Sequence, residues 1–316
     1  MIDDVDFIPV RDPLLRNPAL DYDMTLPVLG LPTRFESNSR HVIETVDQAF
    51  GYWRAVSAMP IPAIEPFRVR IVIHDGPEDS ARPIHVRYIA PDAVRIIAQS
   101  PGSIAISDPE RRESVAFVST TAAGDRDHFR TAFLEATTLA LLAHFDRHPL
   151  HASAIALDGR AVLLVGPSGA GKSTLAHLAH HAGIDVMSED RVWVQLEPSL
   201  AIWGTPGHAR LLVEGSDEKC VVPLAPAGGV ASHYAHSAVV CLLDRGMTAE
   251  LGRIDGVALR DALMSDIAPG FDRFPARHAA SASALAVHGG WRLRLSSDPR
   301  DALPLLRKML HERPTV

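Results

Sequence analysis

The spacing of hydrophobic and polar positions changes character about halfway along the chain. Between residues 68 and 119, segments such as RVRIVIH at 68–74 alternate polar and apolar side chains, as half-buried strands do. After residue 150, continuous apolar runs such as AVLLV at 161–165 alternate with segments of helical spacing, which is typical of buried strands joined by helices. The two patterns predict an α/β chain with two domains, 1–146 and 147–316.

The first domain is expected to be a small α+β domain. Apolar side chains at helical spacing predict helices over 39–57 and 127–147, and Pro149 is expected to end the second helix near His148. The prolines within residues 1–35 predict an extended arm outside the core. Short strands separated by turn-forming residues indicate a small antiparallel sheet, with strands at 68–74, 84–89, 93–98, 103–107 and 115–119.

The second domain is expected to alternate strands and helices. Asp158 and Gly159 separate two apolar segments and predict a tight hairpin turn. The expected strands are 151–157, 161–165, 184–187, 191–196, 238–243 and 291–295. The expected helices begin at about Lys172 and then cover 257–265, 276–287 and 301–311.

The segment GPSGAGKST at 166–174 fits the phosphate-binding pattern G-x-x-x-x-G-K-[ST] in full, between a buried strand and a helix. Glycines allow the tight turn that points successive N–H groups inward, and the following helix N-terminus adds partial positive charge. Lys172 is expected to reach the β- and γ-phosphates, and the Ser173 hydroxyl to bind Mg²⁺. The expected ATP-binding residues of the loop are Gly166, Ser168, Gly169, Ala170, Gly171, Lys172, Ser173 and Thr174, of which Thr174 is expected to pack.

Composition narrows the classes of partner. The chain is 47% hydrophobic and 22% charged, which excludes a disordered chain and a membrane bundle. A net charge of −7 argues against coating of nucleic acid, which needs a basic surface. We therefore expect neither a nucleic-acid nor a membrane partner. Two cysteines and an acidic N-terminus without an apolar signal region predict a cytoplasmic protein with reduced thiols.

Residues on both sides of the loop narrow the class of nucleotide-binding protein. Downstream motifs of GTPases (N-K-x-D) and of transporter ATPases (L-S-G-G-Q) are missing from the sequence. His151 precedes the loop, and the segment SEDRV at 188–192 follows the loop helix. With these neighbours, residues 151–192 resemble the HPr kinase/phosphorylase family, a group of phosphoenolpyruvate-carboxykinase-like P-loop kinases. The resemblance extends loosely from there to the end of the chain, and it does not cover residues 1–145.

The resemblance implies a kinase fold of the HPr kinase C-terminal type and a role for each matching residue. Glu189 stands at the family's proposed base for the acceptor hydroxyl, Asp190 stands near the metal, and His151 stands beside the base. Glu189 replaces the usual aspartate, and the family's HPr-contacting segment is not recognisable. The expected acceptor is therefore a serine-type hydroxyl on a peptide, a small protein or a small molecule. Family members often form rings, so a homo-oligomer is possible.

Other features leave alternatives open. A phosphate-binding cation is expected from a later loop, with Lys219 and Arg210 as candidates. An ATP-gated regulator without catalysis and a bifunctional kinase/phosphorylase remain alternatives to a kinase. His177, His180 and His181 lie at helical spacing and could form a metal-binding face. Since no acidic or cysteine partner is near in sequence, an exposed histidine-rich face is preferred.

Overall fold

The computed structural model describes residues 18–55, 64–75, 95–100, 102–205, 208–212, 219–223, 233–265, 267 and 274–311. The chain is a mixed α/β protein that folds as two compact units, Met1–Leu142 and Ala143–Val316. The domain boundary predicted from sequence, after residue 146, falls in the turn that opens the second unit. Among the described helices, none combines the length and apolar character needed to cross a bilayer.

The start of the described chain is a β-hairpin, so the extended arm predicted there is wrong for this part. Strand β1 (Tyr22–Val28) pairs antiparallel with β2 (Leu31–Ser37), and Pro27 lies opposite Pro32. β1 is the edge strand of its sheet, where a residue without an N–H group interrupts the fewest hydrogen bonds. Residues 1–17 of the predicted arm lie outside the described residues.

The first unit contains one six-stranded sheet of order β1-β2-β3-β6-β5-β4. The prediction of an antiparallel sheet is wrong, because β3 pairs parallel with both β2 and β6. The helix between β2 and β3 carries the chain back across the sheet, which is what a parallel pair requires. The later strands are β3 (Phe67–His74), β4 (Arg95–Ser100), β5 (Ser103–Asp108) and β6 (Glu113–Ser119). The strand predicted at 84–89 lies outside the described residues.

The helices of this unit are shorter than their apolar patterns. They are α1 (Arg40–Phe50), the 3₁₀ turn η1 (Gly51–Ala55), α2 (Thr120–Gly124), α3 (Arg126–His128), the π-helical η2 (Phe129–Glu135) and α4 (Ala136–Leu142). The predicted helix end near His148 is wrong, since α4 ends at Leu142. Residues 143–146 form a turn in which Asp146 takes a φ of 54°, so the helix does not reach the proline.

The second unit is built on a six-stranded sheet of order β10-β8-β9-β16-β18-β17. Strands β9, β16 and β18 are parallel to one another. A four-stranded sheet of order β15-β12-β11-β7 and a hairpin of β13 and β14 complete the unit. The strands are β7 (His148–Leu150), β8 (Ser153–Leu157), β9 (Arg160–Val165), β10 (Asp185–Ser188), β11 (Val192–Gln195), β12 (Ala201–Gly204), β13 (His208–Leu212), β14 (Lys219–Pro223), β15 (Tyr234–Ala235), β16 (Ser237–Arg245), β17 (Glu250–Ile254) and β18 (Gly290–Leu295).

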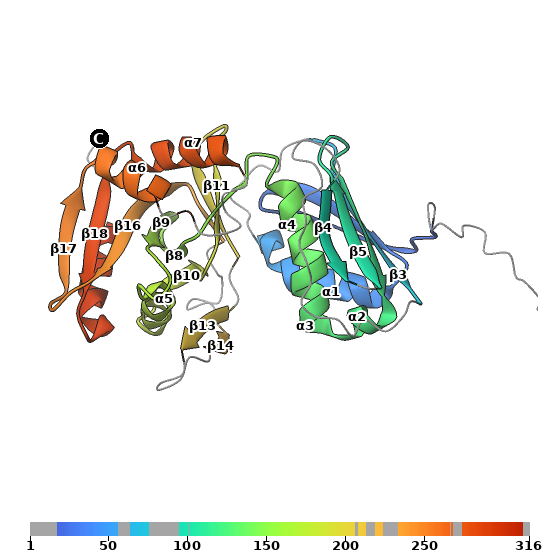
Figure 1. Cartoon of the computed structure of the whole chain (residues 1–316), viewed down its shortest axis with the longest axis horizontal. Helices are drawn as coiled ribbons and strands as arrows, with labels where there is room; N and C mark the ends of the chain where they lie inside the picture. The colour runs from blue at the N-terminus through green and yellow to red at the C-terminus, as the bar shows by residue number, and fades with distance from the viewer. Residues whose placement is uncertain are drawn as a thin grey trace, which may run out of the picture. The chain divides into compact units, whose positions relative to one another are not determined.

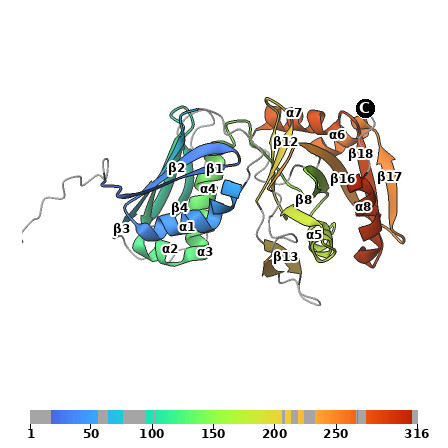
Figure 2. The ribbon, with the colours of Figure 1, turned by 180° about the vertical axis from the view of Figure 1, so that it is seen from behind.

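Two apolar clusters hold this unit together, one on each face of the six-stranded sheet. Figures 1 and 2 show the sheet and the helices that lie beside it. On one face, side chains of the sheet pack against helices α5 and α8. On the other face, they pack against the four-stranded sheet and helices α6 and α7. These helices are α5 (Lys172–His181), α6 (Gly256–Ser265), α7 (Pro275–Ala286) and α8 (Leu303–His311), with the 3₁₀ turn η3 (Pro299–Ala302) before α8. Burial on both faces explains the unbroken apolar run of β9.

A buried pair of histidines joins β7 to α7. His148 Nε2 lies 3.0 Å from His278 Nδ1, and His278 Nε2 lies 2.9 Å from the Leu263 carbonyl oxygen. Because a carbonyl only accepts, His278 carries its proton on Nε2 and His148 donates from Nε2. His148 Nδ1 is then a buried acceptor without a partner among the described residues. Burial, followed by His278 and Arg277, lowers the pKa of His148 to about 4.

This pKa predicts that the chain loses stability in mild acid. The pKa of His148 is about 6.5 in the unfolded chain and about 4 in the folded chain. The stability that depends on the neutral His148 ring is therefore fully present above pH 6.5, and it is lost as the pH falls toward 4. Between pH 7 and pH 4.5 we expect His148 to remove about 2 kcal/mol of unfolding free energy. Urea unfolding measured between pH 7 and pH 4.5 should show a smaller fall in unfolding free energy for His148→Gln than for the parent chain. The exposed His311→Gln variant is the control, and equal declines for His148→Gln and the parent chain would refute the assignment.

Candidate functional site

The topology of the second unit brings the predicted site residues to one edge of the sheet. β9, β16 and β18 are parallel, so their carboxyl ends meet at that edge. β8 runs antiparallel to β9, with Ser153 opposite Leu164, so the start of β8 lies at the same edge. β10 runs antiparallel to β8, with Ser188 opposite Ala154, so the end of β10 also lies there. His151 and the acidic residues 189 and 190 therefore flank the loop that follows β9.

The glycine-rich loop turns the chain sharply from β9 into α5. Gly169 and Gly171 have φ values of 83° and 105°, which L side chains rarely adopt. A Cβ atom on Gly171 would lie 3.0 Å from Leu295 Cδ1, and one on Gly166 would lie 3.2 Å from the Leu243 carbonyl oxygen. Ser168 and Gly169 are exposed, whereas Ala170 is buried in the core cluster. The loop thus packs tightly against β16 and β18 on one side and is open to solvent on the other.

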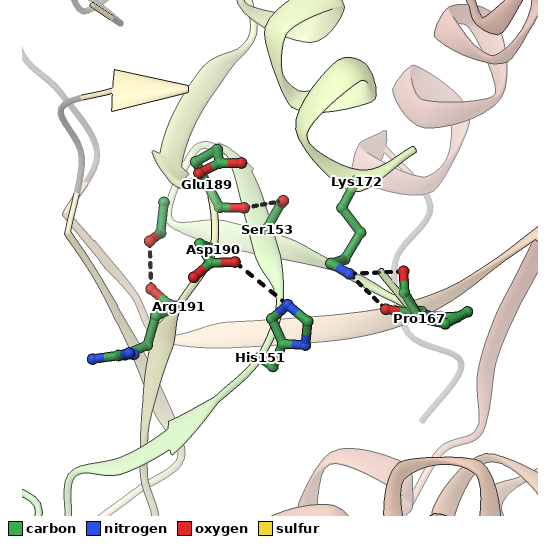
Figure 3. A network of polar contacts seen from close by, with 9 residues as sticks. His151, Ser153, Pro167, Lys172, Glu189, Asp190 and Arg191 are labelled. Carbon is green, nitrogen blue, oxygen red and sulfur yellow. Dashed lines mark hydrogen bonds and ion pairs between the residues drawn. The ribbon is translucent and has the colours of Figure 1, made fainter. Parts of the chain in front are cut away.

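Lys172 is the first residue of α5, and its side chain curls back into the loop. Its ammonium donates to the carbonyl oxygens of Gly166 at 2.6 Å and Pro167 at 3.1 Å, as Figure 3 shows. The residue is only 7% exposed. The residue before α5 is Gly171, which has no side chain to cap the helix, so the start of the helix faces the loop directly. This arrangement fits a bound phosphate, because it gathers one cation and several N–H donors.

The two other motif residues of α5 differ in their surroundings. Ser173 is half-buried in the first turn of the helix. Thr174 is exposed, so the expectation that it packs is wrong. Helical geometry turns successive side chains by about 100°, which separates these two neighbours. Ser173 is the hydroxyl that could contact Mg²⁺.

His151 and Asp190 form an ion-pair contact at the same edge of the sheet. His151 Nε2 lies 3.4 Å from Asp190 Oδ1, and Figure 3 shows the two side chains pointing toward each other. The Asp190 side chain is 61% exposed and that of His151 is 22% exposed. The family resemblance implies that the histidine stands beside Glu189, whereas the structure brings it to Asp190. A carboxylate that is both held and open to solvent can meet an incoming hydroxyl group.

Glu189 has different surroundings from its neighbour. The residue is 8% exposed, and its main-chain carbonyl accepts a hydrogen bond from the Ser153 hydroxyl. The Ser188 hydroxyl donates to the Arg191 carbonyl and lies 3.3 Å from the Thr205 hydroxyl. These bonds fix the backbone of the turn that ends β10. The turn therefore presents Asp190 outward while Glu189 is enclosed.

Arg245 is a cation at this edge that the sequence analysis missed. It ends β16, and its Nη2 donates to the Gly169 carbonyl oxygen at 3.2 Å. Its backbone N–H donates to Asp244 Oδ1 at 2.8 Å, so the pair of charged residues is ordered. The signal was present in the sequence, because a charged pair directly follows an apolar run that predicts a buried strand.

The two cations predicted from sequence to bind phosphate lie in a separate hairpin. Arg210 lies in β13 and Lys219 lies in β14, which pair as an antiparallel hairpin. Their side chains lie outside the described residues. Arg245 is therefore the later cation that the described residues bring to the loop.

Comparison with known proteins adds a distant structural similarity. No family model and no curated protein matches the chain. A solved structure of the Hpr(Ser) kinase/phosphatase from Coxiella burnetii is similar at 14% identity with a TM-score of 0.30, covering 51% of this chain and 87% of that one. A TM-score of 0.30 is too low to transfer a fold or a function. We therefore base the functional proposal on the residues of this chain.

The loop geometry predicts unequal costs for two alanine substitutions. Gly169→Ala meets open space, so only the positive φ opposes it, at about 1–2 kcal/mol. Gly171→Ala adds a Cβ 3.0 Å from Leu295 Cδ1 and should cost more unfolding free energy. Urea unfolding of both variants measures the difference, with Gly169→Ala as the matched control. A Gly171→Ala variant no less stable than Gly169→Ala would contradict this loop geometry.

Proposed function

We propose that the chain is an ATP- and Mg²⁺-dependent kinase that transfers the γ-phosphoryl group to a serine-type hydroxyl on a peptide, a small protein or a small molecule. The observation that carries the proposal is the meeting of two features at one sheet edge. One is a phosphate-binding loop whose lysine points into the loop. The other is an exposed carboxylate held by a histidine. Phosphoryl transfer needs both charge neutralisation at the phosphates and a group that orients the nucleophile.

The loop supplies the phosphate contacts in this proposal. Lys172 would exchange its two carbonyl acceptors for β- and γ-phosphate oxygens, and the N–H groups at the start of α5 would contact the same oxygens. Arg245, which already contacts the loop at Gly169, would add a second positive charge. Mg²⁺ would neutralise phosphate charge when bound, and Ser173 is the residue that would hold it, with Asp190 near the ion.

His151 and Asp190 would act on the hydroxyl group of the phosphoryl acceptor. Asp190 would accept the hydroxyl proton as the acceptor oxygen bonds to the γ-phosphorus and the bond from that phosphorus to the β-phosphate oxygen breaks, releasing ADP. His151, 3.4 Å away, would orient the carboxylate. Glu189, which is 8% exposed, would act as a support for the turn.

A second candidate function is ATP binding without catalysis, used to regulate a partner. The observation that favours it is the burial of Glu189, because the residue matching the family's base is enclosed at this edge. Acceptor-dependent ATP turnover distinguishes the two functions. A kinase shows such turnover, whereas a regulator binds ATP and transfers nothing.

Loss of the loop lysine should abolish transfer. We expect Lys172→Ala to lower the rate by about a hundredfold or more, because a charge that contacts the transferred group is removed. The measurement uses ATP labelled in its γ-phosphate, offered with cell lysate and defined hydroxyl acceptors, and mass spectrometry identifies the labelled product. Lys308→Ala, at an exposed lysine of α8, is the matched control. If Lys172→Ala transfers label as fast as the control does, the proposal fails.

The carboxylate and its histidine should affect catalysis unequally. We expect Asp190→Asn to lower kcat by about 10²–10⁴-fold, since the variant cannot accept a proton. His151→Gln should lower kcat less and should change the acid limb of its pH profile, because it acts through Asp190. Binding of ATP should persist in both variants. A full rate for Asp190→Asn together with a large loss for Glu189→Gln would exclude Asp190 as the base.

A further inference from the structure

The far end of α5 carries a pair of imidazoles that the proposed kinase chemistry does not use. His177 and His181 are four residues apart, so they lie one above the other on one face of the helix. Their rings are 4.4 Å apart between centroids and nearly perpendicular, at 86°. The Nε2 atoms of the two rings face each other at 3.1 Å.

This separation fits two ligands of one metal ion. Zinc binds imidazole nitrogen at about 2.0–2.1 Å, and two such ligands at an angle of about 90–109° have their nitrogens about 2.9–3.3 Å apart. The observed 3.1 Å lies inside this range. The same distance also suits an N–H···N hydrogen bond, in which one ring supplies the proton. Adding a metal ion distinguishes the two arrangements, because a ligand pair binds the ion whereas a pair that only shares a hydrogen bond does not.

The surroundings of the pair leave the Nε2 atoms as the nitrogens that can bind an ion. His177 Nδ1 is buried and has no hydrogen-bond partner among the described residues, which leaves Nε2 as its accessible nitrogen. Burial, followed by the neighbouring His181 and His180, lowers the pKa of His177. His181 is exposed, so solvent water can fill the remaining coordination positions.

We propose that His177 and His181 form a two-histidine site for a divalent transition-metal ion such as Zn²⁺ or Ni²⁺, separate from the Mg²⁺ expected at the phosphates. Imidazole suits these ions, whereas Mg²⁺ prefers oxygen ligands. The part of the chain that the structure describes contains no group of three or more His, Cys, Asp or Glu residues placed to hold a metal. Two histidines supply only part of a coordination shell, and water would complete it.

Metal binding here would link two positions one turn apart near the end of α5. The helix begins at Lys172, so the ion would stabilise the element that carries the loop lysine without contacting the loop. An ion that binds only the folded chain raises its stability by mass action. The site thus predicts stabilisation by Zn²⁺ or Ni²⁺ and no requirement for either ion in catalysis.

The test is calorimetric titration of the full chain, freed of affinity tags and chelators, with ZnCl₂ and separately with NiCl₂. We expect the binding of one equivalent of each ion to be lost, or its affinity to fall at least about tenfold, in both His177→Ala and His181→Ala. His180→Ala is the matched control and should retain that equivalent, because its ring meets that of His181 only edge-on at 5.7 Å between centroids, against 4.4 Å for the pair. Excess Mg²⁺ should not displace the ion.

A second readout guards against loss of fold. Alanine is the best helix former, so His181→Ala at an exposed helical position should keep the helix, as circular dichroism would show. Thermal unfolding should then shift upward with NiCl₂ in the parent chain and in His180→Ala but not in His181→Ala. Equal metal binding by His181→Ala and the parent chain would overturn the site, as would loss of binding in His180→Ala alone.

Discussion

The parallel alignment of β9, β16 and β18 is the constraint on which the candidate site depends. Parallel neighbours end at the same edge of a sheet, so the loop after β9 and the charged pair that ends β16 are brought together by pairing alone. The antiparallel strands β8 and β10 then add their own ends to that edge. A shift in this pairing would separate Lys172 from Asp190 even if every side chain were retained.

The core of the second unit holds that alignment in place. Leu175, Ala176 and Ala179 of α5 pack against the sheet on the face that α8 also covers. Leu295, at the end of β18, lies so close to Gly171 that a methyl group there would be in tight contact. One side of the loop is therefore packed against neighbouring strands, while Ser168 and Gly169 remain exposed to solvent. A loop that is already packed on one side and exposed on the other can bind a flexible polyphosphate without the entropic cost of ordering the loop.

Local patterns in the sequence predict much of this unit. The apolar run at 161–165, the hairpin at Asp158 and Gly159, and the helix start at Lys172 all correspond to elements of the structure, because each depends on neighbouring residues. What local patterns do not contain is pairing between distant strands. The parallel pairing of β3 in the first unit and the contact of His151 with Asp190 both depend on segments far apart in the chain. Arg245 was missed for the same reason, since its role appears only when β16 is placed beside β9.

The central claim is that this sheet edge binds the β- and γ-phosphates of a nucleoside triphosphate. Equilibrium binding of ATP and of AMP, each with Mg²⁺, tests it most directly, because the two ligands share a base and a ribose but differ in those phosphates. The loop donors and Lys172 predict that ATP binds at least about tenfold more tightly than AMP. Equal affinities for ATP and AMP, or no measurable affinity for ATP, would contradict the account.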